Sequence, residues 1–177
     1  YGDLDLSTVD EMPPGRTPVR TRIVPEEKRE GIYAYMCAQA AQGRQAYVVC
    51  PLVGEEDMAD GDLRSAAQEQ KELEEALAPL KIGLVHGKMN KAQKEETLGL
   101  FYAGALDVLV ATTVIEVGVN VPNATVMVIE GAERFGLAQL HQLRGRVGRG
   151  AQESWCFLMA QPNERLRTLV STNDGFV

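Results

Sequence analysis

Arg144, Arg146 and Arg149 stand within ten residues, HQLRGRVGRG, at positions 141–150. A guanidinium group donates hydrogen bonds in a planar, two-pronged geometry that matches phosphate oxygens, and it keeps its charge at neutral pH. Arg146 and Arg149 are three positions apart, so together they have the charge and the spacing to grip the terminal phosphate of a nucleotide. Helical spacing also places Gln142, Arg146 and Arg149 on neighbouring parts of one surface.

The same segment also fits a solvent-exposed helix end, where basic side chains interact favourably with the helix dipole. Gly145 and Gly148 each cost a helix about 1 kcal/mol relative to alanine, so we infer that close backbone approach, rather than helix propensity, places them there. We expect His141 to fix this helix rather than to titrate in catalysis. The spacing alone leaves both interpretations of the arginines open.

The chain as a whole is acidic, with 18 Lys and Arg residues against 25 Asp and Glu residues among 177 and a net charge of −7. This balance argues against a protein that coats nucleic acid through its overall charge, so any polyanion must bind to a local group of basic side chains. The composition, 45% hydrophobic and 24% charged, is typical of one globular domain with a sizeable core.

The three cysteines, Cys37, Cys50 and Cys156, lie in apolar stretches and have neither CxxC nor metal-ligand spacing. They predict buried free thiols in a reducing compartment and no metal site. No apolar run approaches the roughly 20 residues that a membrane span needs, and the first residues lack the order of a secretion signal. We therefore expect a cytoplasmic protein without a membrane partner, and a piece of a longer chain.

Residues 1–18 contain three prolines and a glycine in their second half, which predicts an extended connector from a preceding domain. From there to residue 177, strand and helix patterns alternate. This order predicts a single α/β domain with a mainly parallel sheet and helices on both faces. The predicted strands cover 17–24, 46–53, 81–87, 106–112, 124–130 and 154–159; the predicted helices begin after Pro25, near Asp62, at Asn90 in a capping box with Gln93, and near 137.

Ligands of such sheets lie at the carboxyl ends of the strands. Three chemically unusual segments fall there: HGKMN at 86–90, TTVIEVGVNVPN at 112–123, and the turn into HQLRGRVGRG.

The segment QLRGRVGR, at 142–149, resembles motif VI of superfamily 2 helicases, QxxGRxGR, and ATTVIEVGVNVP, at 111–122, resembles their motif V. The longer run 111–150 resembles the RecG family of branch-migration helicases, and so do DLDLSTVDEMPPGRTPVRT at 3–21 and HGKMNKAQKEE at 86–96. The resemblance covers nearly the whole chain. It implies a RecA-like domain of the P-loop NTPase type, and the transcription-repair coupling factor, which has a related motor, is the alternative.

This resemblance implies the second of two RecA-like motor domains. The GxxxxGK[ST] and DExH motifs with which the first domain holds ATP and Mg²⁺ do not occur in these 177 residues, so we expect the chain alone not to hydrolyse ATP. Arg146 and Arg149 would stabilise charge that develops on the γ-phosphate, a contribution of about 10³ to 10⁵ in rate. Gln142 would position water or a phosphate oxygen beside them.

By the same resemblance, Gly118 lets the motif V backbone approach the nucleotide, and position 120 contacts the ribose. Asn120 stands where the family usually has Asp; it keeps an acceptor oxygen for a hydrogen bond to the ribose but lacks the charge that an ion pair needs. Glu116 also matches the family pattern, although a surface carboxylate bonded to nearby backbone explains it equally well.

Thr112 and Thr113 resemble the residues with which related motors hold a nucleic-acid phosphate, a contact that positions a strand without reading its sequence. His86, Gly87 and Lys88 could do the same through a backbone amide and the lysine charge. The alternative for His86 and Gly87 is a plain turn between a strand and a helix.

The function implied is ATP-driven movement along duplex DNA that remodels branched DNA, by fork reversal and Holliday junction migration, in recombination and repair. The implied partners are DNA and the first RecA-like domain and wedge domain of the same chain. A noncatalytic RecA-like module, which uses its basic loop only to dock a protein or hold DNA, is the competing hypothesis.

Overall fold

A computed structural model of the chain describes residues 19–51, 61–86, 89–112, 123–145, 147 and 153–170. Of residues 61–67 and 165 only the backbone is described. The predicted connector, residues 1–18, lies outside these ranges.

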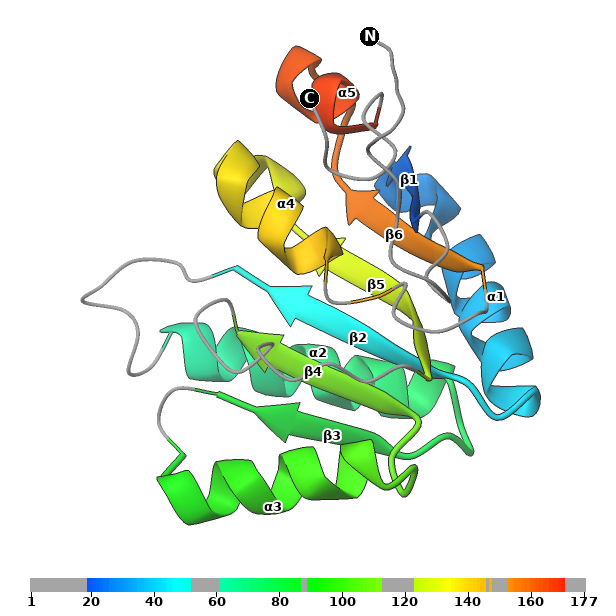
Figure 1. Cartoon of the computed structure of the whole chain (residues 1–177), viewed down its shortest axis with the longest axis vertical. Helices are drawn as coiled ribbons and strands as arrows, with labels where there is room; N and C mark the ends of the chain where they lie inside the picture. The colour runs from blue at the N-terminus through cyan, green and yellow to red at the C-terminus, as the bar shows by residue number, and fades with distance from the viewer. Residues whose placement is uncertain are drawn as a thin grey trace, which may run out of the picture.

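One parallel sheet runs through the described part of the chain, with its strands in the order β1-β6-β5-β2-β4-β3 (Figure 1). β2, β4 and β5 are buried almost from end to end, as expected for apolar strands that are covered on both faces. The predicted parallel α/β sheet is confirmed. The strands are β1 (Val19–Val24), β2 (Gln45–Cys50), β3 (Ile82–Val85), β4 (Val108–Thr112), β5 (Ala124–Glu130) and β6 (Ser154–Met159).

Helices cover both faces of the sheet, as predicted (Figure 1). On one face α1 (Arg29–Ala41) and α2 (Gly61–Ala76) share a core with the sheet. On the other face α3 (Lys91–Tyr102), α4 (Leu137–Arg144) and α5 (Glu164–Val170) contribute to a second core. Two 3-10 turns, η1 (Glu26–Lys28) and η2 (Ala132–Arg134), precede α1 and α4.

The predicted capping box at the start of α3 is confirmed. The backbone N–H of Gln93 donates to Oδ1 of Asn90 over 2.8 Å, and the backbone N–H of Asn90 donates to Oε1 of Gln93 over 3.0 Å. These two bonds satisfy donors that the first turn of a helix leaves free, so α3 begins at a defined residue directly after the loop that follows β3.

Several strand boundaries differ from the prediction. The strand predicted for 81–87 covers Ile82–Val85, and β2 begins at Gln45 rather than at residue 46. The strand predicted for 46–53 ends at Cys50, because Pro51 has no N–H to donate to a neighbouring strand. The strand predicted for 106–112 begins only at Val108, since Asp107 instead accepts a hydrogen bond from the backbone N–H of Lys81.

The predicted burial of the cysteines is correct for Cys50 and Cys156 and wrong for Cys37. All three are free thiols. Cys37 is half-buried because it lies at the margin of the core beneath α1.

Candidate functional site

The register of β3, β4 and β2 brings two of the predicted phosphate-binding loops to one edge of the sheet. Val85, the last residue of β3, lies opposite Ala111 of β4, and Thr112 lies opposite Cys50 of β2. His86 and Thr112 therefore leave adjacent strands at the same height. The loops that begin at these two residues start side by side at the carboxyl ends of the strands.

Thr112 ends β4 with its side chain in the interior, 1% exposed. Its hydroxyl Oγ1 is buried and has no hydrogen-bond partner in the described part of the chain. An unsatisfied buried hydroxyl costs about 1–3 kcal/mol, so this atom marks a place where a polar partner would be gained.

His86 is half-buried and begins a tight turn into α3. Its carbonyl accepts a hydrogen bond of 3.2 Å from the backbone N–H of Met89, and its own N–H lies 3.4 Å from the sulfur of Met89. These bonds fit the simple strand-to-helix turn. They leave the phosphate-binding hypothesis for 86–88 untested.

α4 carries the first part of the arginine segment. Leu140 and Leu143 are buried, as predicted for the core-facing side of this helix, and Gln142 is exposed. The helix ends at Arg144, with Gly145 as its C-cap residue. The α-helix therefore does not extend to Arg146, and helical spacing no longer relates Gln142 to Arg146 and Arg149. Both arginines lie outside the described residues, so their placement beside Gln142 stays a prediction.

Arg144 points into the protein and is 2% exposed. Its Nη1 donates to the backbone carbonyl of Leu169 in α5 over 2.9 Å and to Oγ1 of Thr21 in β1 over 3.2 Å. Its Nη2 lies 3.2 Å from Nδ1 of His141, one turn earlier in α4. A guanidinium group can only donate, so Nδ1 of His141 accepts and the neutral ring carries its proton on Nε2.

His141 therefore has a structural role, in agreement with the prediction that it fixes the helix. Partial burial, and then the charge of Arg144, lower the pKa of His141 below its usual value. Both effects favour the neutral imidazole, which is the form that accepts the hydrogen bond from Arg144.

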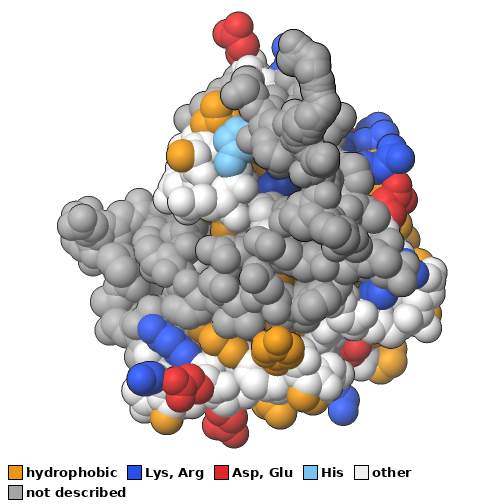
Figure 2. All heavy atoms as spheres, in the orientation of Figure 1, with side chains coloured by type: hydrophobic (Ala, Val, Ile, Leu, Met, Phe, Trp, Pro, Cys, Tyr) orange, Lys and Arg blue, Asp and Glu red, His pale blue; other side chains and the backbone are white. Residues whose placement is uncertain are grey.

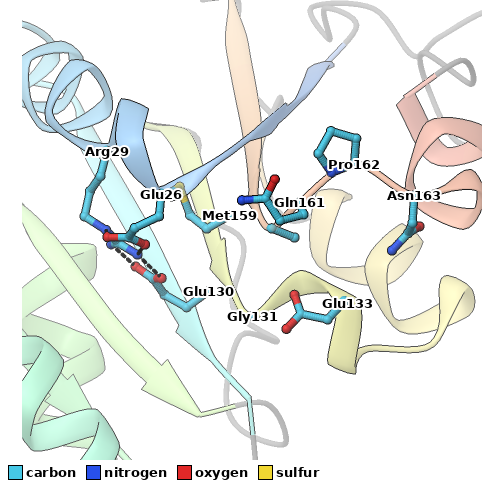
Figure 3. A pocket seen from close by; sticks show the side chains of 10 residues that line it. Glu26, Arg29, Glu130, Gly131, Glu133, Met159, Gln161, Pro162 and Asn163 are labelled. Atoms are coloured by element: carbon cyan, nitrogen blue, oxygen red, sulfur yellow. Dashed lines mark hydrogen bonds and ion pairs between the residues drawn. The ribbon is translucent and has the colours of Figure 1, made fainter.

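A pocket of about 580 Å³ opens at the carboxyl ends of β5 and β6 (Figure 3). Glu130, the last residue of β5, Glu26 of η1 and Glu133 of η2 line it together with Arg29, and Gln161 and other residues after β6 close it. Glu26 and Glu130 thus flank Arg29 at the edge where ligands of such sheets lie, while Glu133 lies apart from them on the pocket wall (Figure 3).

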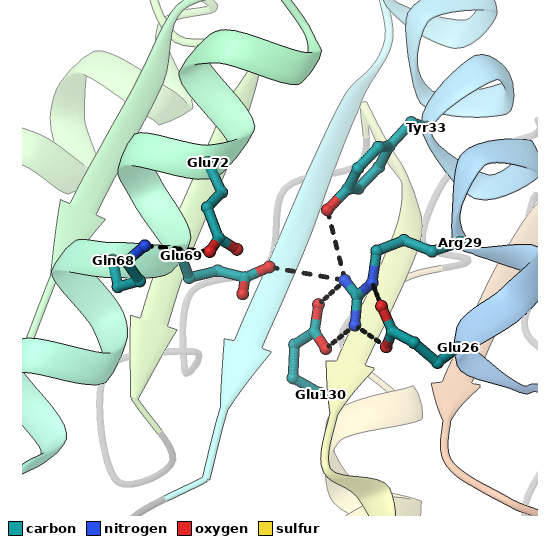
Figure 4. Close-up of polar contacts among 7 residues, drawn as sticks. All are labelled: Glu26, Arg29, Tyr33, Gln68, Glu69, Glu72 and Glu130. Atoms are coloured by element: carbon teal, nitrogen blue, oxygen red, sulfur yellow. Dashed lines mark hydrogen bonds and ion pairs between the residues drawn. The ribbon is translucent and has the colours of Figure 1, made fainter.

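Arg29 joins the elements around this pocket (Figure 4). It donates to both oxygens of Glu130, over 2.6 and 2.7 Å, and to both oxygens of Glu26, over 2.6 and 2.8 Å. Its Nη1 also reaches the hydroxyl of Tyr33 over 3.3 Å and lies 3.9 Å from Oε2 of Glu69 in α2. The bonded arginine lowers the pKa of Glu26.

Glu69 of α2 lies beside Arg29, but at 3.9 Å it is too far away to accept a hydrogen bond from it. Burial, and then the neighbouring carboxylate of Glu130, raise the pKa of Glu69 to about 9. Both effects favour the protonated form of the Glu69 carboxyl.

Sequence reasoning missed the inward turn of Arg144 and the whole Arg29 cluster. For Arg144 a signal exists: it follows Leu140 by four positions, which places it on the buried side of the helix. For Glu130 the signal is a carboxylate that ends the otherwise apolar strand ATVMVIE. Nothing in the sequence pairs Glu130 with Arg29.

Basic charge also gathers where the sequence analysis did not predict it. Arg20 and Arg22 of β1 lie over the ring of Trp155, with their guanidinium carbons 5.9 and 5.8 Å from its centroid. Trp155 in turn stacks on Phe157. Figure 2 shows Lys and Arg side chains grouped near β1 and the start of α1.

Most of the predicted site residues lie outside the described ranges. Gln142, His86 and Thr112 are described; the others are Arg146, Arg149, Glu116, Gly118, Asn120, Gly87, Lys88 and Thr113. Within the described part of the chain, no group of three or more His, Cys, Asp or Glu side chains is arranged to hold a metal ion. The helices of that part are also too short or too polar to cross a membrane.

Comparison with known proteins places the chain in a family. The model of the helicase conserved C-terminal domain matches residues 27–151. The chain belongs to this family. This helicase domain is 50% identical to the ATP-dependent DNA helicase RecG of Escherichia coli K12 over 184 residues, and 47% identical to that of Thermotoga maritima over 182. The alignments cover 100% and 99% of the chain but only 26% and 23% of those relatives, so the domain spans about a quarter of their length.

Solved structures agree with this assignment. The structure of RecG bound to a three-way DNA junction matches the helicase domain with a TM-score of 0.77 and 43% identity, over 98% of this chain and 22% of that one. Dbp5 of S. cerevisiae, at 12% identity, matches with a TM-score of 0.58 over 86% of this chain and 37% of that one, which shows a shared fold. The predicted RecA-like fold is confirmed.

Proposed function

We propose that this domain is the second motor domain of an ATP-dependent DNA helicase or translocase that remodels branched DNA in recombination and repair. One observation carries the proposal: the identity of about half of all residues to proteins named ATP-dependent DNA helicase RecG extends over the whole chain. In the longer protein, the domain would act with a first RecA-like domain and a wedge domain. The bacterial relatives support a cytoplasmic location in a bacterium.

The nucleotide-facing residues would be Arg146 and Arg149, which stabilise charge on the γ-phosphate, and Gln142, which orients water or a phosphate oxygen. The exposed side chain of Gln142 and the anchored end of α4 support this role. ATP, held with Mg²⁺ mainly by the first motor domain, supplies the phosphoryl group whose transfer drives movement.

The nucleotide contact would be completed by Glu116, Gly118 and Asn120, which follow β4 in the sequence. Gly118 would allow the backbone to approach, Asn120 would accept or donate a hydrogen bond at the ribose, and Glu116 would hold the loop. In the sequence they follow within about eight positions a strand that ends at the carboxyl edge of the sheet, which supports this assignment.

The DNA-facing residues would be Thr112 and Thr113 after β4, and His86, Gly87 and Lys88 after β3. The adjacent ends of these strands support a shared contact with one phosphate backbone. The unsatisfied hydroxyl of Thr112 supports a polar partner at this edge. Alternate closing and opening of the two motor domains would turn this grip into steps along duplex DNA.

The test is the Arg146→Ala, Arg149→Ala double variant of the full-length protein, with DNA-stimulated ATP hydrolysis as the measurement. We expect kcat to fall by about 10³-fold or more, because each finger stabilises the transition state rather than the bound nucleotide. Binding of a three-way DNA junction should change by less than about threefold.

Arg134→Ala is the matched control, since Arg134 is exposed and lies in η2 of the same domain. It should hydrolyse ATP at the normal rate. A double variant with normal DNA-stimulated hydrolysis would refute the finger role of Arg146 and Arg149 and favour a domain that contributes no catalytic residues.

A further inference from the structure

We propose that Arg144 is a positioning residue, which fixes the turn that leads from α4 to the two finger arginines. Arg144 lies inside the motif QLRGRVGR, yet its side chain turns away from solvent and is 2% exposed. The inference rests on the proposed function, because it concerns the placement of Arg146.

The guanidinium of Arg144 ties three separate elements together. It bonds to Leu169, 25 positions later in α5, and to Thr21, 123 positions earlier in β1, in addition to His141 in its own helix. A buried charge is tolerated only where hydrogen bonds compensate for the loss of water. The three bonds meet that condition and define the orientation of the end of α4.

The turn after Arg144 is anchored on its other side as well. The backbone N–H of Gly145 closes the helix on the carbonyl of His141 over 3.1 Å, and the N–H of Val147 lies 3.4 Å from the carbonyl of Arg144. Val147 is 0% exposed and belongs to the core beneath α4. Arg146 thus stands in the sequence between two buried anchors, one polar and one apolar.

Position matters at this point because a catalytic group that is misplaced by about 1 Å can lose about 10²-fold in rate. The planar fork of Arg144 reaches α5, β1 and His141 at once, whereas a lysine offers a single ammonium on a flexible stem. A lysine at this position would keep the positive charge but could not reproduce the three hydrogen bonds to Leu169, Thr21 and His141. We therefore expect the conservative change to disturb the turn while preserving the fold.

β1 is the first strand and α5 the last helix of the described chain. Arg144 accordingly connects the end of α4 to the first strand and the last helix of the described chain. A displacement of either element would be transmitted to α4 through this side chain.

The experiment compares Arg144→Lys with wild type in the full-length protein, with ATP hydrolysis measured on saturating junction DNA. We expect kcat to fall by about 10- to 100-fold while KM for ATP changes less than twofold, because the affected contact forms in the transition state. Arg167→Lys, on the exposed side of α5, is the matched control and should keep a normal kcat.

Thr21→Val provides a second variant of nearly unchanged volume, which removes one acceptor of Arg144. It should lower kcat by about three- to fivefold. An Arg144→Lys protein with wild-type kcat, whatever its melting temperature, overturns the inference.

A double-mutant cycle separates positioning from general damage. In an Arg146→Ala background, with phosphate release followed over hours, Arg144→Lys should change the residual rate less than twofold. An equal loss in both backgrounds would mean that Arg144 does not act through Arg146, and the inference fails. Normal hydrolysis by the Arg146→Ala, Arg149→Ala variant would instead refute the proposed finger role on which this inference rests, so the two failures are distinguishable.

Discussion

Both carboxylate oxygens of Glu130 accept hydrogen bonds from Arg29, although 101 positions separate the two residues. The bonds join the start of α1 to the last residue of β5. The Arg29 and Glu130 side chains are 20% and 13% exposed. This pair holds α1 against the strand that leads into α4, the helix of the arginine segment.

We expect Glu130→Gln to lower the free energy of unfolding by about 1–3 kcal/mol, since it leaves a largely buried guanidinium without its best-shielded counter-charge. Urea unfolding of the 177-residue chain at pH 7 measures the loss. Glu26→Gln is the control. Glu26 bonds to the same arginine but its side chain is 71% exposed, so this variant should lower the free energy of unfolding by less than about 1 kcal/mol. Equal losses would contradict the special role of the buried pair.

Stability should also fall as the pH rises from about 5 to 9, through Glu69. The pKa of Glu69 is raised to about 9 in the folded chain, so between the usual value near 4.5 and about 9 the unfolded chain ionises this carboxyl more readily than the folded one. The free energy of unfolding is therefore unaffected by Glu69 below about 4.5 and decreases as the pH rises above that value. The loss per pH unit in this window is at most about 1.4 kcal/mol.

Glu69→Gln removes this ionisation, so its unfolding free energy should vary less between pH 6 and pH 8.5 than that of wild type. Urea unfolding at several pH values gives the comparison. Parallel pH profiles for the two proteins would show that Glu69 ionises normally.

His141 should titrate below pH 6.5 in the folded chain, because burial and the charge of Arg144 disfavour the imidazolium. Its contribution to stability is present above the usual pKa and is lost as the pH falls through the lowered one. Proton NMR of the imidazole C–H signals tests this; the chain has two histidines, and His141→Gln assigns the signal. A pKa at or above 6.5 would contradict the hydrogen bond from Arg144 to Nδ1.

The three thiols should differ sharply in reactivity. Cys156 is completely buried, which raises its pKa to about 12, and Cys50 is also buried, whereas Cys37 is half-buried. At pH 8 a thiol reagent should modify Cys37 within minutes and the other two only after unfolding, because the thiolate is the reactive form. Mass spectrometry of native and urea-treated samples counts the modified thiols. Cys37→Ser should abolish the native reaction, and rapid native labelling of Cys156 would refute the burial described.

The succession of elements could be predicted because its signals are local. The apolar runs of β2, β4, β5 and β6, the capping box of Asn90 and Gln93, and the helical spacing of Leu140 and Leu143 all act within a few residues of the chain. The motif QLRGRVGR is likewise a contiguous signal, so the family resemblance can be recognised from the sequence alone. The end of α4 was not predictable in the same way, since propensity alone does not determine whether a helix continues past a single glycine.

The sequence by itself determined the α/β class, the parallel strands and the family resemblance of the domain, because periodicity and short motifs depend on neighbours along the chain. Only the tertiary structure decided which charges turn inward. Arg144 and Arg29 have the same side chain as the exposed Arg134. The difference is set by partners such as Thr21 and Glu130, since a buried charge is stable only where distant parts of the chain supply its hydrogen bonds.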